Sequence, residues 1–322
     1  MAAAETAATS TPGCLVWQAR EVANQVLVDV DGRQLKLSNL DKVLYPAVGL
    51  TKAQVIDYYT RVAPAMLPHL HGRPLTLKRY PDGVSSSYFY EKNCPSHRPP
   101  WVRTIAVRSR DSKKEIHYCV VDDLPSLVWA ANLACIEFHT SLSLGKDVLR
   151  PTMIVFDLDP GAPADIVQCC EVGLRLRAWL DERRLDALAK TSGSKGLQVY
   201  VPLNTSVSYE ETKTLALNVA HALEAELPKL VVSSMSKSLR PGKVFVDWSQ
   251  NDDHKTTICV YSLRAREQAT VSTPVTWDEV EECARRRQPQ VLAHDAAQVL
   301  RRVEERGDLF APVLRKKQKL PA

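Results

Sequence analysis

The segment Met153-Ile-Val-Phe-Asp-Leu-Asp159, followed by Pro160-Gly161, decides the fold that this sequence predicts. The apolar run is short and stops at a Pro-Gly pair, which is the pattern of a buried strand that ends in a turn. Because side chains alternate along a strand, Asp157 and Asp159 project from the same face. Two like charges held side by side need a cation, and carboxylate oxygens suit Mg²⁺ or Mn²⁺. We therefore expect a metal site at the end of this strand.

A second apolar strand, Lys243 to Trp248, carries Asp247 near its end. If the two strands are neighbours, Asp247 supplies a third carboxylate to the first pair. Two divalent ions about 3.5–4 Å apart are the usual arrangement for phosphoryl transfer between nucleotides. For an isolated Asp-x-Asp, surface acids that merely end a strand remain an equally good interpretation.

The loop Ser192-Gly-Ser-Lys-Gly196 has the composition of a phosphate-binding turn, with glycines, hydroxyl donors and one lysine. The spacing is not that of a Walker A motif. Taken alone, such a loop is more often a plain turn. Beside the aspartate pair it predicts a triphosphate site.

The remaining pattern predicts a single composite α+β domain. A hairpin is expected over 26–37 around Asp31-Gly32, and a helix is expected after the capping box Thr51-x-x-Gln54. A second helix is expected from about Pro125 through Phe138, with His139 at its end. Further helices are expected at 164–184, 210–226, after Thr276, and at 295–306.

Length and composition bound the class of protein. The 322 residues are 45% hydrophobic and carry a net charge of +5, which excludes a disordered chain and permits a polyanionic partner. We expect a flexible leader over 1–21, the folded domain over 22–312 and a solvated basic tail over 313–322. No stretch is long and apolar enough to span a bilayer, so a cytoplasmic, nucleoid-associated protein is expected. The eight cysteines form no Cys-x-x-Cys pair and are expected to be reduced thiols, without a disulfide framework or a zinc site.

Three motifs, FDLDPG (156–161), TSGSKGL (191–197) and KSLRPGKVFVDWSQN (237–251), resemble the polymerase domain of bacterial DNA ligase D, of the archaeo-eukaryotic primase superfamily. The resemblance extends from residue 37 to residue 266 and covers nearly all of the folded chain. It implies an RRM-like catalytic sheet packed against a second sheet and flanking helices. It also implies Mn²⁺- or Mg²⁺-dependent gap filling or end extension, often with ribonucleotides, in non-homologous end joining beside Ku and a ligase.

The resemblance assigns roles to individual residues. The implied catalytic metal ligands are Asp157, Asp159 and Asp247. The residues implied to hold the triphosphate and its sugar are Lys78, His139, Ser192, Lys195 and Arg264. Those implied to bind a 5′-phosphate across a gap are Asn39, Lys42 and Lys52, and those implied to meet the template are Phe89, Tyr90 and Arg240. An isolated lysine is usually solvated and an aromatic beside another is usually core, so ordinary roles remain open for Lys42, Lys52 and Phe89.

One position departs from the family pattern. Gln198 stands where the family motif SGSKGLH carries histidine. Glutamine offers a donor and an acceptor from a flexible stem and does not exchange a proton near neutral pH. We expect this exchange to loosen the site and to reduce activity or change the metal preference.

Other functions compete with the polymerase interpretation. In the motif of a haloacid-dehalogenase-type phosphatase, Thr or Val follows the second aspartate, whereas Pro160 follows it here. A nucleotide-sugar transferase has no need for the basic loop around Arg240. A DNA primase and a non-catalytic DNA-end-binding factor remain alternatives. No KxDG motif of a nucleotidyl ligase is present, so the expected partners are DNA ends or gapped DNA, NTP or dNTP, Ku and a separate ATP-dependent DNA ligase, with no membrane.

Overall fold

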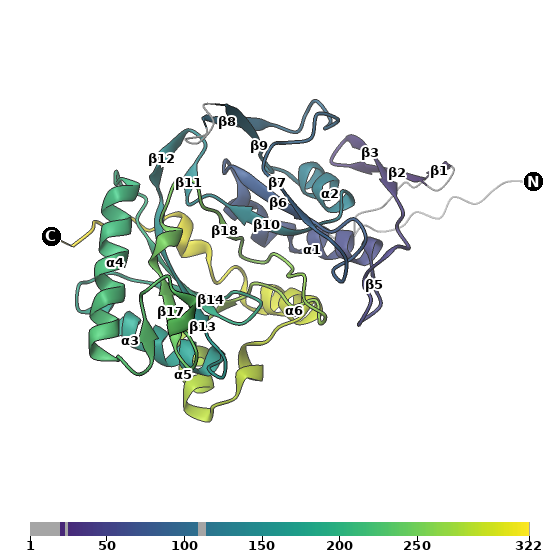
Figure 1. Cartoon of the computed structure of the whole chain (residues 1–322). Coiled ribbons are helices and arrows are strands. Elements are labelled where there is room, and N and C mark those ends of the chain that lie inside the picture. The colour runs from purple at the N-terminus through teal and green to yellow at the C-terminus, as the bar shows by residue number, and fades with distance from the viewer. Residues whose placement is uncertain (1–19, 23–24, 109–113, 322) are drawn as a thin grey trace, which may run out of the picture.

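The computed structural model describes residues 20–22, 25–108 and 114–321 (Figure 1). Helices and several sheets are mixed, which confirms the expected α+β class. The predicted leader falls almost entirely outside the described residues. The basic side chains of the tail are exposed as expected, but Gln318 is buried and donates to the carbonyls of Asp186 and Pro202. The expectation of a fully solvated tail is therefore wrong at Val313 and Gln318.

The first half of the molecule is built mainly from the N-terminal 151 residues. Its strands are β1 (Arg20–Val22), β2 (Gln25–Val30), β3 (Arg33–Ser38), β4 (Val43–Tyr45), β5 (Leu50–Thr51), β6 (Leu75–Arg79), β7 (Phe89–Glu91), β8 (Thr104–Arg108), β9 (Glu115–Cys119), β10 (Cys135–Thr140), β11 (Ser143–Leu144) and β12 (Asp147–Pro151). Its helices are α1 (Lys52–Leu70) and α2 (Leu124–Asn132). The main sheet has the order β18-β10-β6-β9-β8, with β7 paired to β6 and β18 (Thr257–Ile258) contributed from later in the chain.

Two expectations for this half are confirmed and one is wrong. β2 and β3 form the predicted hairpin, and the Thr51–Gln54 capping box opens α1. The second predicted helix is too long, because α2 ends at Asn132 and the chain turns through Ala134 at a φ of 58°. The residues after the turn pair with β6, so His139 lies in the interior of β10 rather than at a helix end. The apolar residues that follow Asn132 belong to a buried strand. Hydrophobic periodicity alone does not distinguish such a strand from a continuation of the helix.

The second half contains the segment MIVFDLD. Its strands are β13 (Met153–Pro160), β14 (Leu188–Thr191), β15 (Leu197–Pro202), β16 (Val231–Val232), β17 (Val244–Asp247) and β19 (Pro274–Val275), in the order β16-β17-β13-β15-β14-β19. Its helices are α3 (Ile166–Asp181), α4 (Tyr209–Glu226), α5 (Trp277–Arg286) and α6 (Ala296–Arg306). Short 3₁₀ turns occupy Lys237–Leu239, Trp248–Gln250, Pro289–Leu292 and Ala311–Leu314. All four predicted helices after residue 160 are therefore present.

The two faces of β13 enter different cores. Ile154, Phe156 and Leu158 are fully buried in the core that contains the apolar faces of α3 and α4. Met153 and Val155 point the other way and join the core of the first half. The alternation therefore places the strand's carboxylates on the face turned away from α3 and α4. Figure 1 shows these two helices together on one side of this sheet, away from β6 and β10.

A disulfide corrects the expectation of reduced cysteines. Cys94 is bonded to Cys119 at the end of β9, with Cα atoms 4.9 Å apart. A sequence separation of 25 residues gives no signal of this pairing, which arises only once the loop after β7 lies along β9. The other described cysteines are free and buried, as expected: Cys135, Cys169, Cys170, Cys259 and Cys283. Among the described residues, no helix combines the length and apolar character that crossing a membrane requires.

Candidate metal and phosphate site

The strand register brings the three predicted carboxylates together. β13 pairs antiparallel with β17, and Asp157 lies directly opposite Asp247. Asp159 is two residues further along β13, opposite Phe245 and on the same face as Asp157. The two apolar strands are neighbours, so the condition under which Asp247 supplies a third carboxylate is met.

The electrostatics of this group favour a bound cation. Burial, the charge of Asp159 and then that of Asp247 raise the pKa of Asp157 to about 7. Burial and Asp247 also raise the pKa of Asp159. Within the described part of the chain, the buried Oδ1 of Asp157 has no hydrogen-bond partner. An unpartnered carboxylate oxygen beside two more carboxylates fits a hard divalent cation such as Mg²⁺ or Mn²⁺.

Asp247 is held in place by its own strand end. It is 8% exposed, and its Oδ1 accepts a hydrogen bond from the backbone N–H of Ser249 at 2.9 Å while its Oδ2 accepts one from Nε2 of Gln250. The carboxylate oxygens of the three aspartates are too far apart to surround one ion as they stand. Among the described residues, the three candidate ligands that lie within 4.8 Å of one another are residues 252–254. Binding of a cation would have to draw the carboxylates of β13 and β17 closer together.

A buried lysine that the sequence did not single out completes a row across the sheet. Lys190 of β14 lies opposite Gln198 of β15, which lies opposite Asp157. Nζ of Lys190 donates to Oε1 of Gln198 at 2.5 Å and to Oγ of Ser272 at 2.7 Å. Burial lowers the pKa of Lys190 to about 7, and Asp157 acts in the opposite direction. The sequence contains one indication of Lys190: a charged residue follows Leu188 and Ala189 directly before the predicted phosphate loop.

Gln198 is not the loosely held residue that the sequence suggested. Its side chain is 3% exposed and also accepts from the hydroxyl of Tyr200 at 3.4 Å. Gln198 lies opposite Asp157 on the neighbouring strand and lowers the pKa of Asp157 against the larger effect of burial. The expectation of looseness is therefore wrong, because Lys190 and Tyr200 both donate to the buried amide oxygen.

The loop Ser192–Gly196 lies directly against the aspartate strand. A Cβ built on Gly196 would lie 2.3 Å from the carbonyl oxygen of Leu158, so only glycine allows this approach. Oγ of Ser192 accepts from the backbone N–H groups of Ser194 and Gly196, at 3.2 and 3.1 Å. Lys195 is exposed, and a cavity of about 540 Å³ opens beside the loop. The loop thus packs against the strand of the aspartates at Gly196 and leaves Lys195 exposed.

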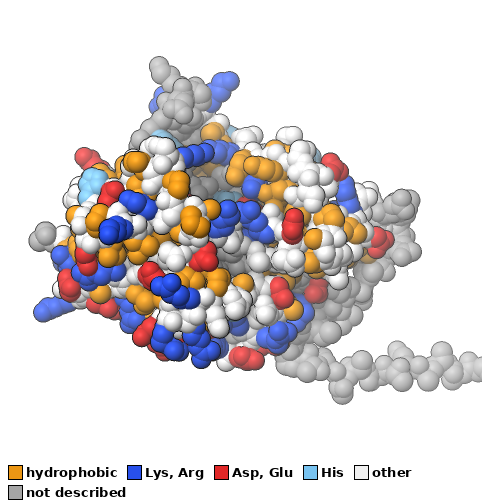
Figure 2. Space-filling view, turned by 60° about the horizontal axis from the view of Figure 1, so that its bottom comes forward, with side chains coloured by type: hydrophobic (Ala, Val, Ile, Leu, Met, Phe, Trp, Pro, Cys, Tyr) orange, Lys and Arg blue, Asp and Glu red, His pale blue; other side chains and the backbone are white. Residues whose placement is uncertain are grey.

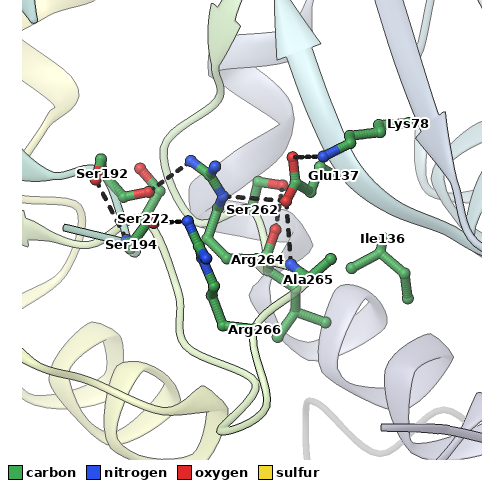
Figure 3. Close-up of polar contacts among 12 residues, drawn as sticks. Lys78, Ile136, Glu137, Ser192, Ser194, Ser262, Arg264, Ala265, Arg266 and Ser272 are labelled. Carbon is green, nitrogen blue, oxygen red and sulfur yellow. Dashed lines mark hydrogen bonds and ion pairs between the residues drawn. The ribbon is translucent and has the colours of Figure 1, made fainter. Parts of the chain in front are cut away.

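The other predicted triphosphate residues converge on Glu137, as Figure 3 shows for Lys78 and Arg264. Lys78 of β6 and His139 of β10 both approach Oε2 of Glu137, at 3.6 and 3.0 Å. Nε of Arg264 lies 3.2 Å from Oε1 of the same carboxylate. Glu137 was not among the predicted site residues, although a charged residue two positions before His139 in an apolar segment was a signal.

Arg264 joins the two halves of the site. Its Nη1 donates to the carbonyl of Ser192 at 2.8 Å, while its Nε contacts Glu137 (Figure 3). Burial and Asp247 raise the pKa of Asp159, and Arg240 and Arg264 act against this. The predicted triphosphate residues and the predicted metal ligands therefore face one another across the interface of the two sheets.

Arg240, which the resemblance assigns to the template, lies close enough to Asp159 for its charge to lower the pKa of that carboxylate against the larger effects of burial and Asp247. Its guanidinium carbon lies 3.8 Å from the centre of the Phe245 ring, and Nη2 donates to the carbonyl of Met235. A Cβ on Gly161 would lie 2.1 Å from the carbonyl oxygen of Arg240, so glycine lets this basic loop pack against the end of β13.

The predicted aromatic pair is exposed but divided between two faces of β7. Phe89 and Tyr90 are 44% and 55% exposed, so the core role is excluded for both. Lys78 lies over the rings of Tyr90 and Tyr88, whereas Arg79 lies over Phe89. Tyr88, 51% exposed, was missed by sequence analysis. Since Tyr88 and Tyr90 lie on the same side of β7 as Lys78, they are the exposed aromatic residues next to the predicted triphosphate-binding residues.

The three predicted 5′-phosphate residues also meet. The backbone N–H of Lys42 donates to the carbonyl of Asn39, and that of Lys52 donates to the carbonyl of Lys42. Lys52 is buried, and its Nζ donates to the carbonyl of Ser38 at 2.6 Å, so it is not an ordinary solvated lysine. Burial and then the charges of Lys42 and Arg79 lower its pKa to about 8. Lys42 is paired with Asp82 at 2.7 Å and remains 39% exposed.

Comparisons with known proteins identify the family of this chain. A family model described as LigD, primase-polymerase domain, matches residues 51–310. The chain is 43% identical over 282 residues to the multifunctional non-homologous end joining protein LigD of Mycolicibacterium smegmatis, covering 87% of this chain and 36% of that protein. It is 31% identical over 289 residues to the bifunctional LigD of Bacillus subtilis, covering 89% and 45%. The chain therefore spans less than half the length of these curated relatives.

Among solved structures, the polymerase domain of Mycobacterium tuberculosis ligase D, determined in complex with DNA, superposes with a TM-score of 0.81. The two share 40% sequence identity, and the match covers 88% of this chain and 99% of that one. With the fold, the motifs and the family model in agreement, this chain belongs to the LigD primase-polymerase domain family.

Proposed function

We propose that this chain adds ribo- or deoxyribonucleotides to 3′ ends and gaps of DNA by two-metal nucleotidyl transfer. The observation that carries the proposal is the placement of Asp157 opposite Asp247 on paired strands, with Asp159 on the same face. Carboxylates that converge on one face, one of them with a buried unpartnered oxygen, suit divalent ions better than a purely structural role.

Each group in the site has a task in this reaction. Asp157, Asp159 and Asp247 would hold Mg²⁺ or Mn²⁺, which neutralises charge on the attacking and leaving oxygens. Lys78 and Arg264 supply fixed positive charge to the triphosphate, and His139 donates without a permanent charge. The remaining contacts to the phosphates come from Ser192 and Lys195.

DNA ends or gapped DNA are the proposed substrate. The solved relative was determined with DNA, and the curated relatives are named for non-homologous end joining. Figure 2 shows Lys and Arg side chains gathered near the middle of one face of the molecule, beside a hollow. Such a surface attracts a polyanion. We place the chain in end-joining repair, acting with Ku and an ATP-dependent DNA ligase near the nucleoid.

Primer extension on a gapped duplex with a 5′-phosphate tests the proposal. Labelled ribo- and deoxynucleotides are compared with Mg²⁺, with Mn²⁺ and without metal. Metal-dependent extension by the wild type, absent in Asp157→Ala, supports polymerase activity. Tight DNA binding without extension under any of these conditions would instead identify a non-catalytic end-binding factor.

A further inference from the structure

The centre of the predicted triphosphate site is occupied by a buried carboxylate. Glu137 is 2% exposed, and the residues on either side of it in β10, Ile136 and Phe138, are apolar. A buried carboxylate is costly unless its oxygens are paired. The partners of Glu137 are the residues predicted to bind the nucleotide.

Both oxygens of Glu137 are in use (Figure 3). Oε2 contacts Nε2 of His139 at 3.0 Å and Nζ of Lys78 at 3.6 Å. Oε1 accepts from Nε of Arg264 at 3.2 Å and from the backbone N–H of Ala265 at 3.1 Å. One carboxylate therefore ties together β6, β10 and the segment at 264–265, which are far apart in the sequence.

The charges explain why this arrangement needs Glu137. Burial alone raises the pKa of Glu137, but the hydrogen bond from His139, followed by Arg264 and Lys78, outweighs it and holds the pKa well below its usual range. Burial lowers the pKa of Lys78, and the charge of Arg264 lowers it further, while Glu137 acts in the opposite direction. The cations repel one another and are held together by the single negative charge.

We propose that Glu137 is a positioning residue for nucleotide addition, fixing Lys78, His139 and Arg264 before the triphosphate arrives. This inference rests on the proposed function of the site. The side chain of Glu137 is only 3% exposed, whereas those of Lys78, His139 and Arg264 keep 12%, 14% and 17% of their surface open to an incoming phosphate. Sites held in one geometry before binding save the reaction the cost of arranging them in the transition state.

The isosteric variant Glu137→Gln separates positioning from charge. The amide oxygen still accepts from Arg264 and Ala265, but its NH₂ group opposes the donors Lys78 and His139. Loss of the negative charge leaves the cations more attractive to triphosphate. We expect kcat for extension to fall by about tenfold or more, while the dissociation constant of Mg²⁺-ATP, measured by calorimetry, is unchanged or lower.

Glu279→Gln is the matched control. Glu279 also pairs with an arginine, Arg302 at 2.7 Å, and also accepts a backbone N–H, from Thr276. It therefore reproduces the loss of a part-buried ion pair outside the candidate site. We expect its melting temperature to fall and its kcat to stay at the wild-type value.

A second readout does not depend on catalysis. Burial lowers the pKa of His139, and Glu137 acts against this. The imidazole signal of His139, assigned with His139→Gln, should therefore titrate at lower pH in Glu137→Gln than in the wild type. If Glu137→Gln does not fold, Glu137→Asp is used in its place. Glu137→Asp keeps the charge but shortens the side chain by one methylene, so we expect a smaller fall in kcat.

The inference is overturned if Glu137→Gln extends primers with wild-type kcat and KM, or if its loss of kcat equals that of Glu279→Gln. An unmoved His139 titration also overturns it. An inactive wild type would refute the proposed function instead. The His139 titration and the Mg²⁺-ATP dissociation constant would still test whether Glu137 positions Lys78, His139 and Arg264.

Discussion

Nζ of Lys190 donates a hydrogen bond to Oε1 of Gln198 over 2.5 Å, and Gln198 in turn lies opposite Asp157 and lowers its pKa against the larger effect of burial. The three residues stand in register on three adjacent strands. An amide held at its oxygen by an ammonium presents its NH₂ group in one direction, toward the carboxylate. The sequence suggested that glutamine at this position would be flexible. In the structure, the side chain of Gln198 has a fixed orientation.

The first prediction concerns this pair. Lys190→Met leaves the buried amide oxygen without its charged donor, a loss of roughly 1.5–3 kcal/mol for such a hydrogen bond. We expect the extension rate to fall about tenfold, equivalent to ~1.4 kcal/mol of barrier. Ser272→Ala is the control, because it removes the other acceptor of Lys190 and keeps its contact with Gln198. Equal rates for wild type and Lys190→Met, measured by single-turnover extension, would contradict the prediction.

The sequence alone predicts a faster enzyme on Gln198→His, whereas the structure predicts no gain. The amide oxygen already accepts from Lys190, and the side chain already lowers the pKa of Asp157 against the larger effect of burial, so an imidazole has no vacant role to fill. Extension rates and nucleotide dissociation constants of the two proteins decide between these expectations. A tenfold increase in rate at unchanged affinity would restore the interpretation that Gln198 weakens the site.

The aspartates should be required for chemistry and dispensable for DNA binding. Asp157→Ala or Asp159→Ala removes a metal ligand and leaves the basic residues in place. We expect extension to be abolished while the affinity for gapped DNA, measured by fluorescence anisotropy, stays close to that of the wild type. Normal extension by either variant would refute the assignment of the site.

The stability of the metal-free protein should depend on pH through Asp157. Burial and the charges of Asp159 and Asp247 raise its folded-state pKa to about 7, above the ordinary value of 3.8. Folding therefore favours the protonated form. This stabilisation is complete below about pH 4 and is lost as pH rises through 7.

Asp157→Asn stays uncharged, so without metal it should melt above the wild type at pH 8, and the difference should shrink toward pH 5. Each kcal/mol of relieved repulsion corresponds to roughly 2–4 °C. Added Mn²⁺ should raise the melting temperature of the wild type and not that of Asp157→Asn. Identical pH profiles of the two metal-free proteins would show that Asp157 ionises freely.

Recognition of a 5′-phosphate should require Lys42 and Lys52. Each charge-assisted contact to the phosphate is worth roughly 1.5–3 kcal/mol. Lys42→Ala and Lys52→Ala should weaken binding to gapped DNA that carries the phosphate, with little effect on DNA that lacks it. Lys229→Ala, at an exposed lysine after α4, is the control. Wild-type preference for the phosphate in both variants would show that the lysines are ordinary.

The same preference should depend on pH. Burial, Lys42 and Arg79 lower the pKa of Lys52 to about 8, so its positive charge is lost as pH rises through that value. We expect the ratio of affinities for phosphorylated and unphosphorylated gaps to fall between pH 7 and pH 9. Lys52→Arg keeps its charge and should show a flatter profile. Parallel profiles would exclude Lys52 from phosphate binding.

Local patterns in the sequence determined the elements and the chemistry they carry. The alternation in MIVFDLD placed Asp157 and Asp159 on one face, and a two-residue periodicity is a property of any strand. The capping boxes at Thr51 and Thr276 marked helix starts through contacts three residues apart. Such features depend on neighbours in the chain and can be predicted without knowing the fold.

Tertiary structure decided what depends on contacts between distant segments. The expected helix ending at His139 became a strand because residues 135–140 pair with β6. Glu137 became the partner of Arg264, 127 residues away, and Cys94 found Cys119 through the path of a loop. Gln198 looked loose in the sequence and is fixed in the structure because Lys190 and Asp157 flank it on paired strands. Strand register sets these distances, and register is fixed by the burial of whole sheet faces rather than by any one motif.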